Sequence, residues 1–225
     1  RPHSGTASFR HVATKTMNTH IHVLEAYTAL YKVWKDDGLR ERLAKVINLI
    51  TTKLYNSQTH HLILYCDSNW NNLDDIDSYG HDIETSWLLT EAAEALGDPE
   101  VIGRCRKVAL ELADASLKEG INPMGAMMYE RHKDKIRKDA SWWCQAETVV
   151  GCINAWQLTG EQSYLDSAVR TWNFIKSRMI DKEYGEWFRT VLEDGTPRYK
   201  EPKASMWNCP YHNSRMGFEI DTRLK

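Results

Sequence analysis

The stretch that decides the fold runs from Asp82 to Lys118 and reads DIETSWLLTEAAEALGDPEVIGRCRKVALELADASLK. Apolar residues recur at helical spacing on both sides of Gly97-Asp98-Pro99. Glycine favours the end of a helix, aspartate caps the start of the next one, and proline fits a first helical turn. The sequence therefore predicts two helices, over 82–96 and 99–118, that fold back on each other as a hairpin.

The same hairpin pattern occurs on both sides of this stretch. One copy is broken at Asp36-Asp37-Gly38 and the other at Thr159-Gly160-Glu161. The predicted helices are 18–35 with 39–54, and 142–158 with 162–179. A fourth hairpin is predicted to begin near Pro210. The chain is therefore expected to be an all-α protein of three hairpins and the start of a fourth.

The first helices of the hairpins align on one residue, because Glu25, Glu84 and Glu147 lie 59 and 63 residues apart. A unit of about sixty residues is typical of a helical-hairpin array. A ring of alternating inner and outer helices closes at six hairpins, or about 360 residues. We therefore expect residues 1–225 to form one domain, the C-terminal portion of an (α/α)6 toroid whose N-terminal part is missing from this sequence. The alternative is a half-ring that pairs with another chain.

Composition and charge exclude several classes of protein. With 42% hydrophobic and 27% charged residues, the chain is typical of a soluble globular domain. The net charge of −2 gives no reason to expect nucleic acid or a membrane as partner. The five cysteines are odd in number and form no C-x-x-C pair, so reduced thiols in a cytoplasmic protein are expected. No phosphate-binding loop, dinucleotide fingerprint or nucleophile elbow occurs.

Three of the nine histidines share one context, since His22, His81 and His212 each lie near the start of a first helix and follow an extended segment. These turn-rich segments are 61–70, 125–131 and 184–199, and short β-hairpins or loops on one face of the array are expected there. In a toroid the same end of every inner helix faces the same side, so the three histidines are predicted to converge. A structural role in hydrogen bonding is the alternative for any one of them.

Carboxylates accompany two of these histidines, because Glu25 and Glu84 each follow three residues later and lie on the same helical face. A carboxylate in this position can hold an imidazole in one tautomer. Zinc ligation is conceivable, but the tight spacings of known zinc motifs are absent, and no metal is expected. His60 and His61 are expected to be exposed in a turn.

The tryptophans divide by position. Trp142 and Trp143 open the third first helix at the repeat position of the histidines, and Trp207 precedes His212 by five residues. Aromatic rings at the rim of a cavity can stack on a sugar, so these three are predicted to bind substrate. Tryptophans inside helices are expected to be core residues: Trp34, Trp156 and Trp172.

Four stretches resemble the N-acylglucosamine 2-epimerase superfamily. They are Met17-Asn18-Thr19-His20-Ile21-His22-Val23-Leu24-Glu25-Ala26, Ser78-Tyr79-Gly80-His81-Asp82-Ile83-Glu84, Trp142-Trp143-Cys144-Gln145-Ala146-Glu147 and Trp207-Asn208-Cys209-Pro210-Tyr211-His212-Asn213. The resemblance runs from about Lys15 to Arg215. Within the superfamily, the amino-acid sequences of the second and fourth stretches are most similar to those of cellobiose 2-epimerases.

The resemblance implies a cofactor-free isomerase that inverts C2 of the reducing-end glucose in β-1,4-linked disaccharides such as cellobiose, lactose or mannobiose. It implies that His81 and His212 flank C2 as the two bases, and that His22 hydrogen-bonds the developing oxyanion. Glu84 would orient His81. The residues expected to bind the disaccharide are Asn18, Trp142, Trp143, Glu147 and Trp207.

Other activities stay open at this stage. N-acylglucosamine 2-epimerase and aldose–ketose isomerase activity belong to the same superfamily. A glycoside hydrolase on the same toroid would use two carboxyl groups, for which Glu84 and Glu147 are candidates. A binding or structural fragment is the non-catalytic alternative, and the isolated chain is expected to have little activity. We expect a monomer or weak dimer.

Overall fold

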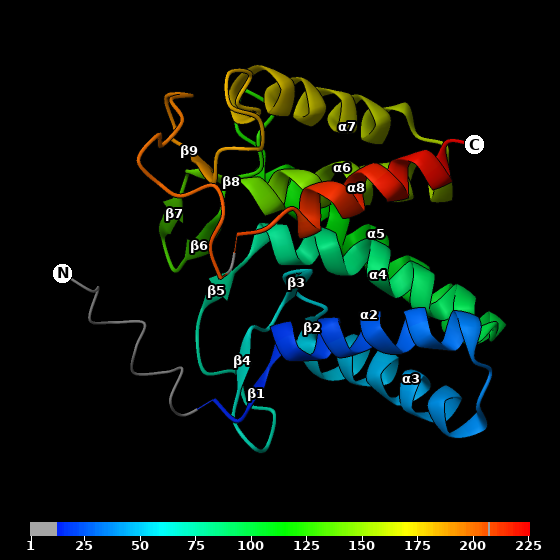
Figure 1. Ribbon diagram of the computed structural model, residues 1–225. Coiled ribbons are helices and arrows are strands. Elements are labelled where there is room, and N and C mark those ends of the chain that lie inside the picture. Colours follow the sequence, from blue (N-terminus) through cyan, green and yellow to red (C-terminus); the bar gives the residue numbers. More distant parts are fainter. Residues whose placement is uncertain (1–12, 207) are drawn as a thin grey trace.

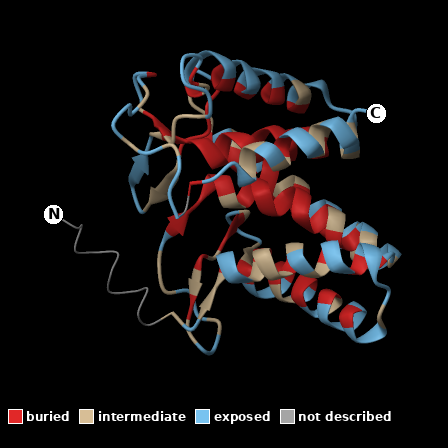
Figure 2. Cartoon of the chain, in the orientation of Figure 1, coloured by how far each residue is buried: buried red, intermediate tan, exposed pale blue. Residues whose placement is uncertain are grey.

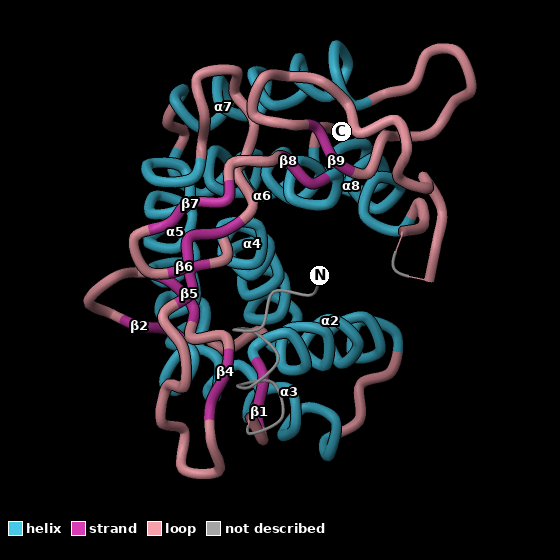
Figure 3. The backbone as a smooth tube through the Cα atoms, turned by 90° about the vertical axis from the view of Figure 1, so that its left-hand side faces the viewer, coloured by secondary structure: helices cyan, strands magenta, loops and turns pink. Residues whose placement is uncertain are grey.

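The computed structural model describes residues 13–206 and 208–225, in which helices form two rows (Figures 1 and 3). The inner row holds the first helix of each hairpin: α2 (Met17–Val33), α4 (Tyr79–Leu96), α6 (Trp142–Thr159) and α8 (Tyr211–Arg223). The outer row holds α3 (Asp37–Leu49), α5 (Pro99–Gly120) and α7 (Gln162–Phe174). Short π-helical segments, η1 (Ile50–Leu54) and η2 (Ile175–Met179), extend α3 and α7. Each inner helix packs on the next inner helix, and each of the first three packs on its own outer partner.

Burial follows the two rows. The inner helices α4 and α6 are buried on nearly every face, because neighbours flank them on both sides (Figure 2). The outer helices α3, α5 and α7 bury one stripe and expose the opposite face, as amphipathic helices do. The main hydrophobic core lies between the rows.

The predicted helix breaks are confirmed. Gly97 ends α4 with a φ of 76°, a left-handed conformation that glycine adopts without steric cost. The Asp98 carboxylate then accepts from the backbone N–H of Glu100 at 2.9 Å, and Pro99 opens α5. Asp36 caps α3 in the same way through the N–H of Leu39. Local sequence therefore fixes where each hairpin turns.

Two glycines let α4 and α6 approach closely. A Cβ atom on Gly80 would lie 2.6 Å from the Cys144 sulfur and 2.7 Å from the Trp143 ring. A Cβ atom on Gly151 would lie 2.8 Å from the carbonyl oxygen of Ile83. Side chains are excluded from both positions, so α4 and α6 pack closely against each other.

The strands lie together at one end of the helices, the left side in Figure 1. They are short: β1 (Lys15–Thr16), β2 (Tyr55–Asn56), β3 (His61–Leu62), β4 (Tyr65–Cys66), β5 (Ile76–Asp77), β6 (Glu130–His132), β7 (Lys135–Arg137), β8 (Ala140–Ser141) and β9 (Thr190–Val191). Two pairs, β2–β3 and β6–β7, are antiparallel hairpins, and the other pairs join distant segments: β1 with β4, β5 with β6, and β8 with β9. The predicted extended face is confirmed, and the inner helices α2, α4, α6 and α8 begin beside it.

Several side chains differ from their predicted environments. Trp34 follows the last residue of α2 and is 56% exposed, and Trp172 is 37% exposed on the outer helix α7, so neither is a core residue. Trp156 is half-buried. His61 is only 2% exposed, because β3 packs against the start of α4. All five cysteines are free thiols. No described helix is long and apolar enough to cross a membrane.

Candidate active site

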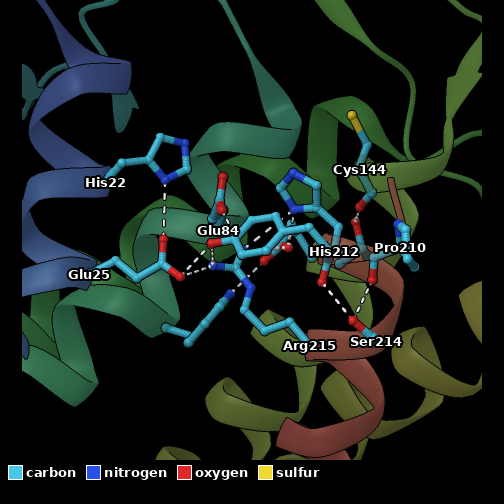
Figure 4. A network of polar contacts seen from close by, with 12 residues as sticks. His22, Glu25, Glu84, Cys144, Pro210, His212, Ser214 and Arg215 are labelled. Atoms are coloured by element: carbon cyan, nitrogen blue, oxygen red, sulfur yellow. Dashed lines mark hydrogen bonds and ion pairs between the residues drawn. The ribbon is translucent and has the colours of Figure 1, made fainter. Parts of the chain in front are cut away.

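The glutamates that align in the sequence repeat converge on one residue, Arg215 of α8 (Figure 4). The Arg215 Nη1 atom donates to Glu25 Oε1 at 2.5 Å. Its Nη2 atom donates to Glu84 Oε1 at 2.6 Å and to Glu147 Oε1 at 2.7 Å. Three inner helices are thereby tied to the fourth at the position on which the sequence repeat aligns.

His212 lies one helical turn before Arg215, and both residues bind the Glu147 carboxylate. Its Nδ1 lies 2.7 Å from Glu147 Oε1, while Glu147 Oε2 accepts from the Trp87 indole N–H at 2.9 Å. A carboxylate accepts, so the His212 Nδ1–H is the donor and the Nε2 lone pair is left free in a neutral ring. Glu147 is 1% exposed, and its oxygens bind His212, Arg215 and Trp87. Contact between Glu147 and the substrate stays a prediction.

His22 forms the pair that the sequence predicts, with 3.1 Å between its Nδ1 and Glu25 Oε2. The hydrogen bond to Glu25 raises the pKa of His22 above its ordinary value, and this outweighs desolvation. Desolvation opposes ionisation of Glu25, yet bonds from His22 and the charge of Arg215 lower its pKa to about 2. Both shifts favour the charged form of the His22–Glu25 pair.

His81 has a different partner from the one predicted. Its Nδ1 lies 2.6 Å from the Ser78 hydroxyl, whereas the Glu84 carboxylate points to Arg215. The prediction that Glu84 orients His81 is wrong in this structure, because the buried guanidinium attracts that carboxylate more strongly than a neutral ring does. Desolvation, helped by the nearby His22 and His212, lowers the pKa of His81 to about 3. His81 is neutral at physiological pH.

Trp143 contacts both His81 and His212, the two histidines that the family resemblance implies are the bases. Its ring centroid lies 4.5 Å from that of His81 and 5.7 Å from that of His212. The ring centroid of Trp142 lies 6.3 Å from that of His212, edge to face. Both tryptophans are buried, with 8% of each exposed.

The two buried carboxylates, Glu84 and Glu147, have pKa values shifted in opposite directions. Desolvation and the negative charge of Glu147 raise the pKa of Glu84. Glu147 is equally desolvated, but hydrogen bonds from His212 and Arg215 overcome that effect and lower its pKa. Ligand atoms of Glu84, Glu147 and His212 lie within 4.8 Å of one another, a spacing that suits a metal ion. The Arg215 guanidinium already supplies a positive charge to both carboxylates there.

The N-acylglucosamine 2-epimerase family model matches residues 4–213. The chain belongs to this family. Its solved relatives share the arrangement of helices: it superposes on a sugar epimerase from a ruminal bacterium with a TM-score of 0.90 and 38% sequence identity, over 94% of this chain and 54% of the other.

Two members of the epimerase family are similar along nearly the whole chain. A cellobiose 2-epimerase of Bacteroides fragilis is 44% identical over 92% of this chain and 53% of its own length. A cellobiose 2-epimerase of Ruminococcus albus is 40% identical over 94% of this chain and 54% of its own length. The chain spans about half the length of the curated relatives it matches.

Two further residues are predicted to bind the substrate, Asn18 and Trp207. Asn18 is exposed in the first turn of α2, and Trp207 lies outside the described residues. Sequence reasoning missed Arg215 and Ser78. Arg215 follows His212 by three residues, as Glu25 follows His22, so continuing the repeat to the fourth helix would have found it. No spacing rule identifies Ser78, because its role depends on the turn that precedes α4.

Proposed function

We propose that the full-length protein inverts C2 of the reducing-end glucose unit of a β-1,4-linked disaccharide, with cellobiose as the reference substrate. The observation that carries the proposal is that one indole, Trp143, contacts both His81 and His212. The similarity to proteins named cellobiose 2-epimerase over more than nine-tenths of this chain favours the disaccharide substrate.

The chemistry needs two bases. After the sugar ring opens, one histidine removes the proton from C2, and the electron pair of that C–H bond forms a planar enediolate. The other histidine returns a proton to the opposite face, so no atom or electron is gained or lost. His212 suits this work, because its Nδ1–H donates to Glu147 and leaves the Nε2 lone pair free. His81 suits it in the tautomer whose Nδ1–H donates to the Ser78 hydroxyl.

The enediolate oxygen needs a donor. His22 suits that role because its raised pKa favours the imidazolium, which donates a hydrogen bond to negative charge as it develops. Asn18, Trp142, Trp143 and Trp207 are proposed to contact the disaccharide. Glu84 and Glu147 are proposed to hold Arg215 and His212 in position.

A glycoside hydrolase is the rival activity, and the carboxylates argue against it. Hydrolysis requires two carboxyl groups that face the scissile bond. Glu84 and Glu147 are each 1% exposed and both bind the same nitrogen of Arg215. Neither is free to protonate a leaving oxygen.

Product analysis tests the proposal. The full-length protein is incubated with cellobiose, and the products are separated by chromatography and weighed by mass spectrometry. A glucosyl-mannose of unchanged mass is expected. Free glucose would establish hydrolysis, and a glucosyl-fructose as main product would establish aldose–ketose isomerisation. Conversion of N-acetylglucosamine but not cellobiose would assign the other epimerase substrate class.

We also propose that these hairpins form part of a six-hairpin ring in the full-length protein. An apolar groove of about 350 Å³ between α6, α7 and α8 supports this, since a further helix would cover it. Its walls include Val149, Ile153, Leu165, Trp172 and Ile220. The full-length structure tests the ring, and a solvent-exposed groove there would contradict it.

A further inference from the structure

A second cluster of ionisable side chains lies away from Arg215, on the far side of the start of α4. It joins His61 of β3, Asp77 of β5, Glu119 near the end of α5, and Asp82 of α4. His61, Asp77 and Asp82 are buried, whereas the Glu119 side chain is 42% exposed. The cluster borders a pocket of about 490 Å³ that Glu119, Arg131 and residues of α5 line. It takes no part in the proposed epimerisation.

Asp82 fixes how His61 is presented. Its Oδ2 lies 2.8 Å from His61 Nδ1, and its Oδ1 accepts from the Leu62 backbone N–H at 2.9 Å. The carboxylate therefore accepts from Nδ1–H, and Nε2 is the nitrogen that faces Glu119 and Asp77. Burial opposes ionisation of His61, but Asp82, Asp77 and Glu119 raise its pKa to about 9, so a bound ion would replace the proton on Nε2. Histidines that bind metal ions are oriented by carboxylates in this manner.

His61 Nε2 is buried and has no hydrogen-bond partner among the residues that the structure describes. It points between two carboxylates, with 3.4 Å to Glu119 Oε2 and 3.8 Å to Asp77 Oδ2. A buried polar atom without a hydrogen bond is costly, and a bound ion would satisfy this nitrogen. Its two neighbours are oxygen atoms with lone pairs to share.

The spacing fits a small cation. Ligand atoms of His61, Asp77 and Glu119 all lie within 4.8 Å of one another. Bonds of about 2.0–2.1 Å in tetrahedral geometry place neighbouring ligand atoms roughly 3.4 Å apart. The distance from His61 Nε2 to Glu119 meets that value, and the distance to Asp77 exceeds it by a few tenths of an ångström.

Charge also favours a cation. Arg131 donates to Asp77 through Nε at 2.8 Å and balances one carboxylate. Asp82 and Glu119 remain without an arginine or lysine partner in the described contacts of this cluster. The pocket lining holds four carboxylates, those of Asp77, Glu111, Asp114 and Glu119, and its basic side chains are Lys118, Arg131 and the imidazoles of His60 and His61. A divalent ion would neutralise the surplus.

We propose that His61, Asp77 and Glu119 bind a divalent transition-metal ion, with Zn²⁺ as the preferred ion and water as its fourth ligand. One imidazole with two carboxylates suits zinc, whereas magnesium takes oxygen ligands and keeps most of its waters. The ion lies between β3, β5 and α5, so it clamps the strand-rich face onto the end of α5. Its role is structural, and it is independent of the proposed epimerase activity.

The test measures zinc directly. Full-length protein is stripped with EDTA, dialysed, and titrated with zinc chloride in an isothermal calorimeter. One zinc ion per chain is expected to bind with micromolar or lower Kd, and magnesium chloride is expected to give no saturable heat. X-ray absorption of the zinc complex is expected to show only nitrogen and oxygen ligands, including one imidazole.

Two matched variants assign the site. Glu119→Gln removes a ligand from a half-exposed position, and we expect it to weaken zinc binding at least about tenfold. Glu111→Gln makes the same charge change on α5 in the same pocket and is expected to leave the Kd unchanged. Circular dichroism confirms that both fold. Absence of zinc uptake by the unsubstituted protein, a sulfur ligand, or equal Kd values in Glu119→Gln and the unsubstituted protein would each overturn the proposal.

Discussion

Arg215 of α8 occupies the repeat position that Glu84 occupies on α4, and its Nη2 donates to the Glu84 carboxylate at 2.6 Å. A repeat of four glutamates would place four like charges at the centre of the inner helices, which is unfavourable in a buried environment. One arginine among three glutamates instead supplies donors for all of them. The fourth helix is thus electrostatically complementary to the other three.

Arg215→Met tests this complementarity. The substitution keeps much of the side-chain volume but leaves buried Glu84 and Glu147 without their cation. Removing one partner of a buried ion pair costs about 3–5 kcal/mol of unfolding free energy. Urea denaturation followed by circular dichroism measures the loss.

An exposed arginine provides the control for that variant. Arg106 pairs with Glu94 at 3.1 Å, with both side chains about half exposed. Arg106→Met is expected to change the unfolding free energy by less than about 1 kcal/mol. Equal effects of the two substitutions would contradict the role given to Arg215. Adding Glu84→Gln to Arg215→Met is expected to restore part of the lost stability.

Glu25→Gln is expected to change how stability depends on pH. The pKa of Glu25 falls from 4.5 to about 2 on folding, so the unfolded chain binds the proton more readily. Its contribution is therefore complete above pH 4.5 and disappears as the pH falls toward 2. Thermal unfolding midpoints of the two proteins should differ at pH 7 and converge in that window. A difference that stays constant from pH 7 to pH 3 would contradict the assignment.

Ser78→Ala tests how His81 is positioned. Ser78 holds the His81 Nδ1 at 2.6 Å, and losing one hydrogen bond of about 1.4 kcal/mol corresponds to a tenfold fall in rate. We expect kcat to fall by about tenfold with little change in KM, and Ser78→Thr to restore most of it. Ser177→Ala, on the exposed side of η2, is the control. A rise in KM at constant kcat would assign Ser78 to substrate binding instead.

Much of the fold could be predicted because its signals are local. Gly97, Asp98 and Pro99 act within a few residues of one another, and the helix boundaries there agree with the sequence. The tryptophans show the limit of this approach. A helical position does not say which row the helix joins, so Trp172 was expected in the core and lies on the exposed side of an outer helix.

The sequence predicts which positions carry the residues of the candidate site, but it does not predict every pair of side chains that bind each other. The repeat aligns Glu25, Glu84 and Glu147, and the structure shows all three beside Arg215. Which carboxylate binds which cation depends on distances across helices, and so Glu84 pairs with Arg215 rather than with its neighbour His81. The burial of His61 likewise depends on Asp82, which lies 21 residues away in the sequence.

Exchange of the C2 hydrogen tests the two-histidine proposal most directly. The full-length protein and its His81→Ala and His212→Ala variants are incubated with cellobiose in heavy water, and deuterium at C2 of the reducing-end unit is followed by NMR. The unsubstituted protein is expected to incorporate deuterium and form the C2 epimer, while each variant, confirmed as folded, is expected to form no C2 epimer, and the variant that lacks the base facing the C2 hydrogen of cellobiose is also expected to incorporate no deuterium. Formation of the C2 epimer at the unsubstituted rate in either variant would contradict the two-base account.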